Sequence, residues 1–433
     1  MKKVLIICYY WPPAGGPGVQ RWLKFVKYLR DYNIEPLVYV PENPSYPIVD
    51  PSLIKEIPEG ITVLKHPISE PYALAKLFSK KDTETISSGI IDEKEKQTFF
   101  QKLMLYIRGN FFIPDARKFW VKPSVKFLTQ YLKKNQIDVI ITTGPPHSLH
   151  LIGLKLKEDL SLPWIADFRD PWTSIGYHDK LKLNKRSERK HNKLEKQVLE
   201  GADHILTTSP TTTADFEKLT NVPITCITNG FDEEYFEAVD LDTEFSLSHI
   251  GSLLSDRNPK MLWQVLQEIK REQPQFDKDL KLKLAGRVSN SVVKTIKEYG
   301  LEKNLELVGY LSHPKALIAQ RTTQVLLLIE INAKDTQAII PGKVFEYLAA
   351  KRPILGIGPD DSDFFEIVSA TNSGTCFTYF EKTALKDHIL SLYKNYKEIG
   401  LASNTSKISQ YSRKALTEKL AFVINDLIDE KSQ

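Results

Sequence analysis

The sequence predicts an α/β protein built from two doubly wound domains. Short apolar runs alternate with amphipathic stretches along the chain, and this alternation starts again near residue 245 after a polar, acidic segment at 232–244. A chain of 433 residues is also too long for a single hydrophobic core. We therefore expect an N-terminal domain at 1–235 and a C-terminal domain at 236–412. A final helix within 413–433 is long enough to pack back on the first domain.

The individual elements follow from the periodicity of the apolar residues. Helices are expected at 18–32, 149–160, 259–272 and 413–429, where apolar residues recur at helical spacing. Strands are expected in the first half at 3–9, 36–40, 60–64, 138–142, 163–167, 204–208 and 224–227, and in the second half at 246–250, 281–285, 305–308, 325–329 and 353–356. Strands that alternate with helices form parallel sheets, which bind ligands beyond the carboxyl ends of their strands.

The composition excludes several classes of protein. Three scattered cysteines argue against a disulfide framework and show no metal-ligand spacing. A net charge of +5 does not by itself indicate a nucleic-acid binder. The first apolar run is short and lacks a small-residue cleavage site, and no run reaches the ~20 residues that span a bilayer. We expect a cytoplasmic protein without a metal or cofactor.

The segment at 340–358 is the most informative part of the chain. A turn ending at Gly342 leads into a short helix that carries Lys343 and Glu346. A helix N-terminus presents free N–H groups and partial positive charge, which suits a diphosphate. A cation such as Lys343 is poorly placed there unless an anion binds, and Glu346 can accept hydrogen bonds from a ribose. The segment therefore favours a nucleotide-sugar site.

Two further loops are candidates for the same ligand. Gly15 and Gly16 follow the first strand and allow a close approach of the backbone to an anion, although the spacing is not that of a dinucleotide site. Arg257 stands just before a helix of the second half, where it can clamp a diphosphate. The alternatives are a tight turn without a ligand and a solvated basic residue.

The loops after two strands of the first half carry candidate catalytic groups. His147 is held by a Gly-Pro-Pro turn, and it is expected either to bond a sugar hydroxyl or phosphate or to cap the next helix. Asp167, Arg169 and Asp170 form a second group. They are expected either to orient or deprotonate an acceptor hydroxyl or to form a self-contained ion pair.

The segment at 99–134 interleaves aromatic and basic residues. It predicts either a helix pair with inward aromatics or a surface that rests on anionic lipid head groups. In the second case the protein would be peripheral at the inner face of the membrane.

These motifs resemble the retaining glycosyltransferases of family 4, which have the GT-B fold of two Rossmann-like domains facing a cleft. The resemblance covers essentially the whole chain and is most specific at 144–148, 167–172, 229–232, 341–350 and 352–353. It implies that the second domain binds a nucleoside-diphosphate-sugar and the first an acceptor, with no metal ion. It also implies that Glu346 contacts ribose, that His147 meets the donor sugar, and that Gly15, Gly16 and Arg257 lie beside the diphosphate.

The chain departs from the family pattern at two positions. Ala338 stands where the first glutamate of the Glu-x7-Glu motif is expected, and Ser252 stands where an arginine is usual. Arg257 and Lys343 are the candidate substitutes for that arginine. We expect a metal-independent glycosyltransferase that acts on a glycan or lipid-linked acceptor of the cell surface. The alternatives are a nucleotide-sugar epimerase of the same fold and a non-catalytic scaffold that binds glycans or membranes.

Overall fold

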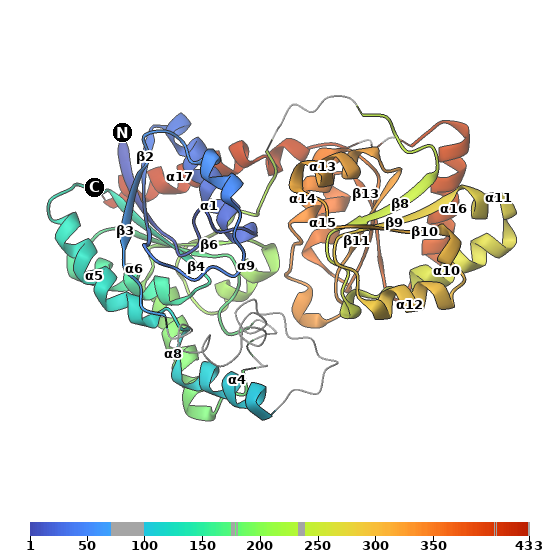
Figure 1. The fold of residues 1–433 in the computed structure, drawn as a ribbon. Helices are drawn as coiled ribbons and strands as arrows, with labels where there is room; N and C mark the ends of the chain where they lie inside the picture. The colour runs from blue at the N-terminus through green and yellow to red at the C-terminus, as the bar shows by residue number, and fades with distance from the viewer. Residues whose placement is uncertain are drawn as a thin grey trace. The chain divides into compact units, whose positions relative to one another are not determined.

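The computed structural model describes residues 1–70, 99–174, 178, 181–232, 239–401, 403 and 405–431. Contacts divide the chain into two compact units (Figure 1). The first unit contains Met1–Thr228 together with Arg413–Gln433, and the second contains Asn229–Ser412. The second unit thus begins earlier than the boundary after residue 235 that the composition suggests, and the C-terminal helix belongs to the first unit.

The first unit is built on a parallel sheet of seven strands in the order β3-β2-β1-β4-β5-β6-β7. The strands are β1 (Lys2–Ile7), β2 (Ile34–Pro41), β3 (Thr62–His66), β4 (Val139–Gly144), β5 (Trp164–Phe168), β6 (His204–Thr207) and β7 (Ile224–Cys226). The order reverses between β1 and β4, so the loops after these two strands diverge to opposite faces. Ligands of open parallel sheets bind at such a point.

Helices cover both faces of this sheet (Figure 1). Alternate side chains of β1 point to opposite faces, and each face is closed by its own apolar cluster. One cluster contains α1 (Pro17–Leu29) and α17 (Arg413–Lys431). The other contains α5 (Lys118–Leu132), α6 (Ser148–Leu160), α8 (Lys185–Gly201) and α9 (Pro210–Glu217), and α4 (Phe99–Phe111) contacts α8.

The second unit repeats the plan with a parallel sheet of six strands in the order β10-β9-β8-β11-β12-β13. The strands are β8 (Phe245–Ile250), β9 (Leu280–Ala285), β10 (Leu305–Gly309), β11 (Val325–Ile329), β12 (Ile354–Gly358) and β13 (Gly374–Thr378). Its order reverses between β8 and β11. The loops that follow these two strands therefore flank the expected ligand position.

Two layers of helices enclose the second sheet (Figure 1). One layer consists of α10 (Lys260–Glu272), α11 (Pro274–Asp279), α12 (Asn290–Glu298) and α16 (Lys382–Glu398). The other consists of α13 (His313–Thr322), α14 (Lys343–Ala350) and α15 (Asp363–Ala370). The apolar faces of these helices bury both sides of β8 and β11, which holds the loops at the switch point on a rigid base.

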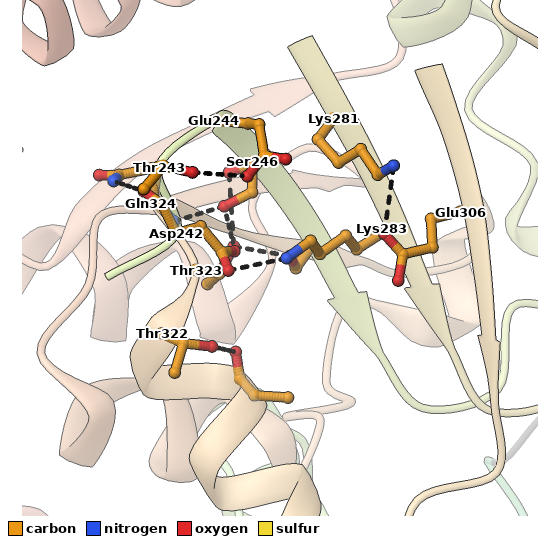
Figure 2. A network of polar contacts seen from close by, with 12 residues as sticks. Asp242, Thr243, Glu244, Ser246, Lys281, Lys283, Glu306, Thr322, Thr323 and Gln324 are labelled. Carbon is orange, nitrogen blue, oxygen red and sulfur yellow. Dashed lines mark hydrogen bonds and ion pairs between the residues drawn. The ribbon is translucent and has the colours of Figure 1, made fainter. Parts of the chain in front are cut away.

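A polar network anchors the start of the second sheet (Figure 2). Asp242, just before β8, pairs with Lys283 of β9 at 2.7 Å. The Ser246 hydroxyl accepts a hydrogen bond from the backbone N–H of Gln324 at 2.8 Å, and Gln324 donates from its side chain to the carbonyl of Asp242 at 2.6 Å. These bonds join the linker to β9 and to the start of β11. The end of the acidic segment therefore belongs to the second unit.

The fold confirms the predicted class of two doubly wound α/β domains, and each expected strand is present with bounds shifted by a few residues. Strand β13 was not predicted. It is an edge strand paired only with β12, and most of its residues are half-exposed, so it lacks the apolar run that marks the buried strands. In the part of the chain that the structure describes, no helix is both long and apolar enough to cross a membrane.

Candidate functional site

The strongest candidate site lies at the carboxyl edge of the second sheet, where β8 and β11 separate. Lys343 is the first residue of α14 and Glu346 the fourth. Tyr347 of the same helix holds α14 against the sheet, because its hydroxyl accepts a hydrogen bond from the Ile250 N–H at 3.1 Å. The helix N-terminus that the sequence predicted as a phosphate site is therefore fixed beside the end of β8.

Lys343 is the central cation of this site. Its ammonium group lies 3.1 Å from the Nε2 atom of His249. Burial and the nearby Arg257 lower the pKa of Lys343 to about 8, against the opposing charges of Glu330 and Glu346. An amine with this pKa is largely charged at neutral pH and is poorly solvated, so it gains much from an incoming anion.

Arg257 is held at the same edge by an acidic partner that the sequence did not point to. It lies at the end of a short 3₁₀ turn, Ser255–Arg257, and its Nε donates to Glu330 at 3.0 Å. Glu330 directly follows β11, has 1% exposure, and also accepts from the Ile331 N–H. The guanidinium is thus oriented at the switch point but is already paired with one carboxylate.

Glu346 is supported from the neighbouring helix. Gln320 of α13 donates from Nε2 to a carboxylate oxygen of Glu346 at 2.7 Å. Gln320 is 1% exposed, so this hydrogen bond is shielded from water. Gly342, directly before the helix, has φ −54 and open space where a Cβ would stand.

The glycine loop of the first unit is paired with another loop. The Gly15 N–H donates to the Ile48 carbonyl at 3.0 Å, and Asp50 N–H donates to Pro13. Gly15 therefore lacks a free amide for a diphosphate. Gly16 has φ +95 and open space at its Cβ position, while a Cβ on Gly18 would stand 2.0 Å from the Arg169 guanidinium. The glycines here allow loop pairing and the approach of Arg169.

Asp167 is part of a closed buried network. Its carboxylate accepts hydrogen bonds from Arg21, Trp22 and Thr143 at 2.8, 2.8 and 2.7 Å, and its exposure is 0%. Burial alone would raise its pKa, but the Arg21 charge and these bonds hold the pKa below its usual range. The ion-pair partner of Asp167 is thus Arg21 of α1, whereas Arg169 and Asp167 both act on the neighbouring Asp170 through their charges.

The other two residues of that group are placed differently. Arg169 donates from its guanidinium to the Pro145 carbonyl, and its N–H donates to Gly144 at 2.9 Å. It therefore braces the turn that carries His147. Burial raises the pKa of Asp170, against the opposing charge of Arg169. Asp170 thus remains the better candidate for proton transfer.

His147 is buried at the start of α6, with 5% exposure. Its ring stacks on Trp172 with centroids 5.1 Å apart, and neither ring nitrogen has a hydrogen-bond partner among the described residues. Burial, then the nearby His150 and Arg169, holds its pKa well below the usual value. The imidazole is neutral, and its two nitrogens, one a donor and one an acceptor, are buried without a partner among the described residues. The helix itself is capped by Asp115, which accepts from the Ser148 N–H at 2.8 Å.

A pocket of about 600 Å³ opens at the carboxyl edge of β1 and β2. Its lining includes Trp11, Tyr46 and the charged groups of Glu42 and Lys65. Behind it, Glu70 fixes the loop after β2, because its carboxylate accepts from the Ser45 N–H at 2.7 Å. Aromatic rings with a few polar groups in a fixed loop are the features of a small-ligand site.

Sequence patterns missed the partners that position the site. Arg21, His249, Gln320 and Glu330 act through contacts between segments that are far apart in the chain. The only local signal was polarity inside an apolar element, such as His249 within a strand. Among the described residues, no group of three or more His, Cys, Asp and Glu side chains could hold a metal ion.

Comparisons with known proteins relate part of the chain to a sequence family and the whole chain to a known fold. Residues 90–235 match the sequence model of Glycosyltransferase Family 4. The fold is similar to that of sucrose-phosphate synthase from Thermosynechococcus elongatus, with 13% identity, 99% of this chain and 100% of that chain covered, and a TM-score of 0.62. A comparison with curated proteins finds no match.

Two other solved structures share the fold. S. aureus TarM, solved with Fondaparinux, alpha-GlcNAc-glycerol and UDP, is 14% identical over 98% of this chain and 100% of that chain, with a TM-score of 0.54. A putative UDP-N-acetylglucosamine 2-epimerase from Listeria monocytogenes is 12% identical over 99% and 98%, with a TM-score of 0.55. At these identities the likeness shows the fold, which is the predicted GT-B fold.

Proposed function

We propose that this GT-B glycosyltransferase, whose residues 90–235 match family 4, moves a sugar from a nucleoside-diphosphate-sugar to a hydroxyl of a glycan or lipid-linked acceptor. The observation that carries the proposal is the half-buried ammonium of Lys343 at the N-terminus of α14, with Arg257 close by. Two cations and a helix N-terminus at a switch point form a site for a diphosphate. Glu346 would then bind the ribose of the same nucleotide.

In the proposed reaction the acceptor oxygen bonds to the anomeric carbon while the bond from that carbon to the diphosphate breaks. The diphosphate leaves with the electron pair, and Lys343 and Arg257 stabilise its developing charge. Because these side chains supply positive charge, no metal ion is needed at the diphosphate. The acceptor proton passes to the departing phosphate oxygen. We propose that the new linkage retains the configuration of the donor, as in the family that the motifs resemble.

The proposed acceptor side is in the first unit. The pocket at Trp11 and Tyr46 has the aromatic surface and charged rim that a sugar ring or lipid head group would contact. His147, neutral and with both ring nitrogens unpaired among the described residues, can donate or accept a hydrogen bond with a sugar hydroxyl. A role in cell-surface polysaccharide synthesis is consistent with such an acceptor.

The test measures release of the nucleoside diphosphate from UDP-, GDP- and ADP-sugars, with and without membrane extract as the source of acceptor. We expect one donor to be consumed faster when extract is present, equally with and without EDTA. Lys343→Met should lower the rate by at least tenfold, whereas Lys351→Met, at the exposed end of the same helix, should not. The proposal fails if no donor shifts the melting temperature or releases a nucleoside diphosphate.

A nucleotide-sugar epimerase is the second candidate, because one solved structure with the same fold is that of a putative UDP-N-acetylglucosamine 2-epimerase. The two activities differ in their products. Proton NMR of the donor incubated without acceptor would show an isomerised sugar for an epimerase and an unchanged or hydrolysed sugar for a transferase. A non-catalytic scaffold would bind a donor without consuming it, and Glu346→Ala would leave its behaviour unchanged.

A further inference from the structure

The contact between Lys343 and His249 joins the first turn of α14 to the interior of the second sheet. His249 is the fifth residue of β8 and has 0% exposure. Its Nδ1 atom lies 3.0 Å from the Leu327 carbonyl of β11, and its Nε2 atom lies 3.1 Å from the Lys343 ammonium. The imidazole therefore links a cation at the edge of the sheet to a backbone carbonyl within it.

The chemistry of the two partners assigns the protons. An ammonium group has three N–H donors and no lone pair, so Nε2 must be the acceptor. A carbonyl can only accept, so Nδ1 carries the hydrogen and donates it to Leu327. The Ser252 carbonyl lies 3.4 Å from the same Nε2 atom, which in this tautomer has no hydrogen to donate to it. Burial, then the positive charges of Lys343 and Arg257, keeps the pKa of His249 well below its usual value, so the ring stays neutral.

The lysine reaches the imidazole through a gap that a glycine provides. Gly251 has φ +130, and a Cβ at this position would stand 2.4 Å from Cε and 2.5 Å from Nζ of Lys343. The charged groups that face the ammonium are Arg257, Glu330 and Glu346. Among the described residues, His249 supplies the hydrogen bond that fixes the ammonium, while the others act over longer distances. Two N–H donors of Lys343 are left for an anion.

We infer that His249 is a positioning residue that holds Lys343 in the geometry for binding the donor diphosphate. The inference rests on the proposed function, since Lys343 has this role only if a nucleoside diphosphate binds. The imidazole accepts one ammonium hydrogen and thereby directs the other two toward the ligand. It keeps a poorly solvated cation charged, because the buried ammonium would otherwise lose a hydrogen-bond acceptor.

A double-mutant cycle on the full chain tests the inference. The probes are inorganic pyrophosphate, which is independent of the nucleobase, and UDP, GDP and ADP, with Kd measured by calorimetry. We expect His249→Phe and His249→Asn each to weaken binding about tenfold, whereas His249→Gln should restore most of it, because its amide can accept from the ammonium and donate to the carbonyl. In the Lys343→Met background, His249→Phe should cause no further loss.

The pH dependence of diphosphate binding is a second test, because His249 would not affect it if its role were structural alone. Binding should weaken as the pH rises through the pKa of Lys343, because only the ammonium attracts the diphosphate. His249→Phe should shift that loss to lower pH. Competitive acetylation of Lys343, followed by mass spectrometry, measures the pKa of this lysine without a ligand, both in the variant and in the wild-type chain.

The outcomes separate the inference from the proposed function. The inference is overturned, and the donor site stands, if His249→Phe weakens binding by the same factor in the wild-type and in the Lys343→Met background. It is also overturned if His249→Phe leaves the acetylation profile of Lys343 unchanged. If the wild-type chain binds none of the four probes, the proposed function fails and the inference fails with it. If all three histidine variants fail to fold, a wild-type acetylation midpoint at the ordinary pKa of a lysine overturns the inference, because it would show that the ammonium is solvated and not held at the buried imidazole.

Discussion

The buried pair of Arg21 and Asp167 links α1 to the end of β5 in the first unit. The side chains are 1% and 0% exposed, and Arg21 also donates to the carbonyls of Ile227 and Thr228, the last residues of that part of the chain. Removing one member of such a pair leaves an uncompensated buried charge. This cost exceeds what the pair itself contributes relative to apolar residues.

We therefore predict that Asp167→Asn lowers the free energy of unfolding by about 3 kcal/mol at pH 7, as measured by urea titration. The pKa of Asp167 is lower in the folded than in the unfolded chain, where it is near 3.8. Its contribution is thus complete above about pH 4 and is lost as the pH falls through the folded pKa. The variant should lose less stability in that acid range than the wild type. Asp159→Asn, which removes an exposed ion pair with Lys155, is the control and should change nothing measurable.

Gly251 has a positive φ, and it also leaves room for the Lys343 side chain that we propose binds the diphosphate. We predict that Gly251→Ala abolishes diphosphate binding and lowers the melting temperature, because its Cβ would occupy the path of Lys343 and its φ of +130 disfavours any side chain. Gly309→Ala shares a positive φ but meets open space. It should show the backbone strain alone, with unchanged diphosphate affinity in calorimetry. Equal binding defects in both variants would contradict this account.

At the scale of elements, α4 and α8 form a surface with apolar and basic parts. Leu103, Tyr106 and Phe111 of α4 and the nearby Phe119 are 40–63% exposed. α8, which contacts α4, exposes Lys185, Arg186, Arg189 and Lys190 in its first two turns. Arg117 does not join this surface, since its side chain is 11% exposed and pairs with Glu70 at 3.2 Å.

This combination supports the proposal of a peripheral contact with anionic lipid. We predict that the chain floats with vesicles containing phosphatidylserine and that binding weakens with salt. Replacing the four basic residues of α8 with glutamine should reduce binding by at least tenfold, since each basic residue contributes about 1 kcal/mol near such a surface. The control replaces four exposed lysines of the second unit: Lys294, Lys297, Lys303 and Lys315. Equal binding by both sets of variants would remove the basis for the proposal.

The elements also show what a sequence can and cannot predict. Buried parallel strands such as β11 are continuous apolar runs, so they were found with bounds accurate to a few residues. Edge strand β13 is half-exposed and gave no such pattern. The motif around Lys343 and Glu346 was readable because its chemistry is local to one helix start. Its supports, His249 and Gln320, come from other elements, and only the packed fold brings them together.

At the scale of the whole molecule, the chain returns from the second unit to complete the first. α17 places Leu416, Leu420, Ile424 and Leu427 in the same apolar cluster as α1 and one face of β1. The C-terminal part of α17 is held by an ion pair, in which Lys2 lies 2.7 Å from Asp429. The first unit thus depends on residues that follow the second unit in the sequence, whereas the second unit is continuous.

We predict that a chain ending at Ser412 loses the folded first unit and keeps the second. Deleting one buried leucine side chain costs about 2–5 kcal/mol, and α17 contributes several such side chains, so the loss is comparable to the whole 5–15 kcal/mol that stabilises a typical domain. Limited proteolysis should then leave a resistant fragment close to 229–412. Leu420→Ala in the full chain should lower the melting temperature of the first unit, whereas Phe422→Ala, at a side chain 71% exposed on the same helix, should not. If the first unit of the truncated chain melts at the same temperature as in the full chain, the sheet and α1 form a sufficient core without α17.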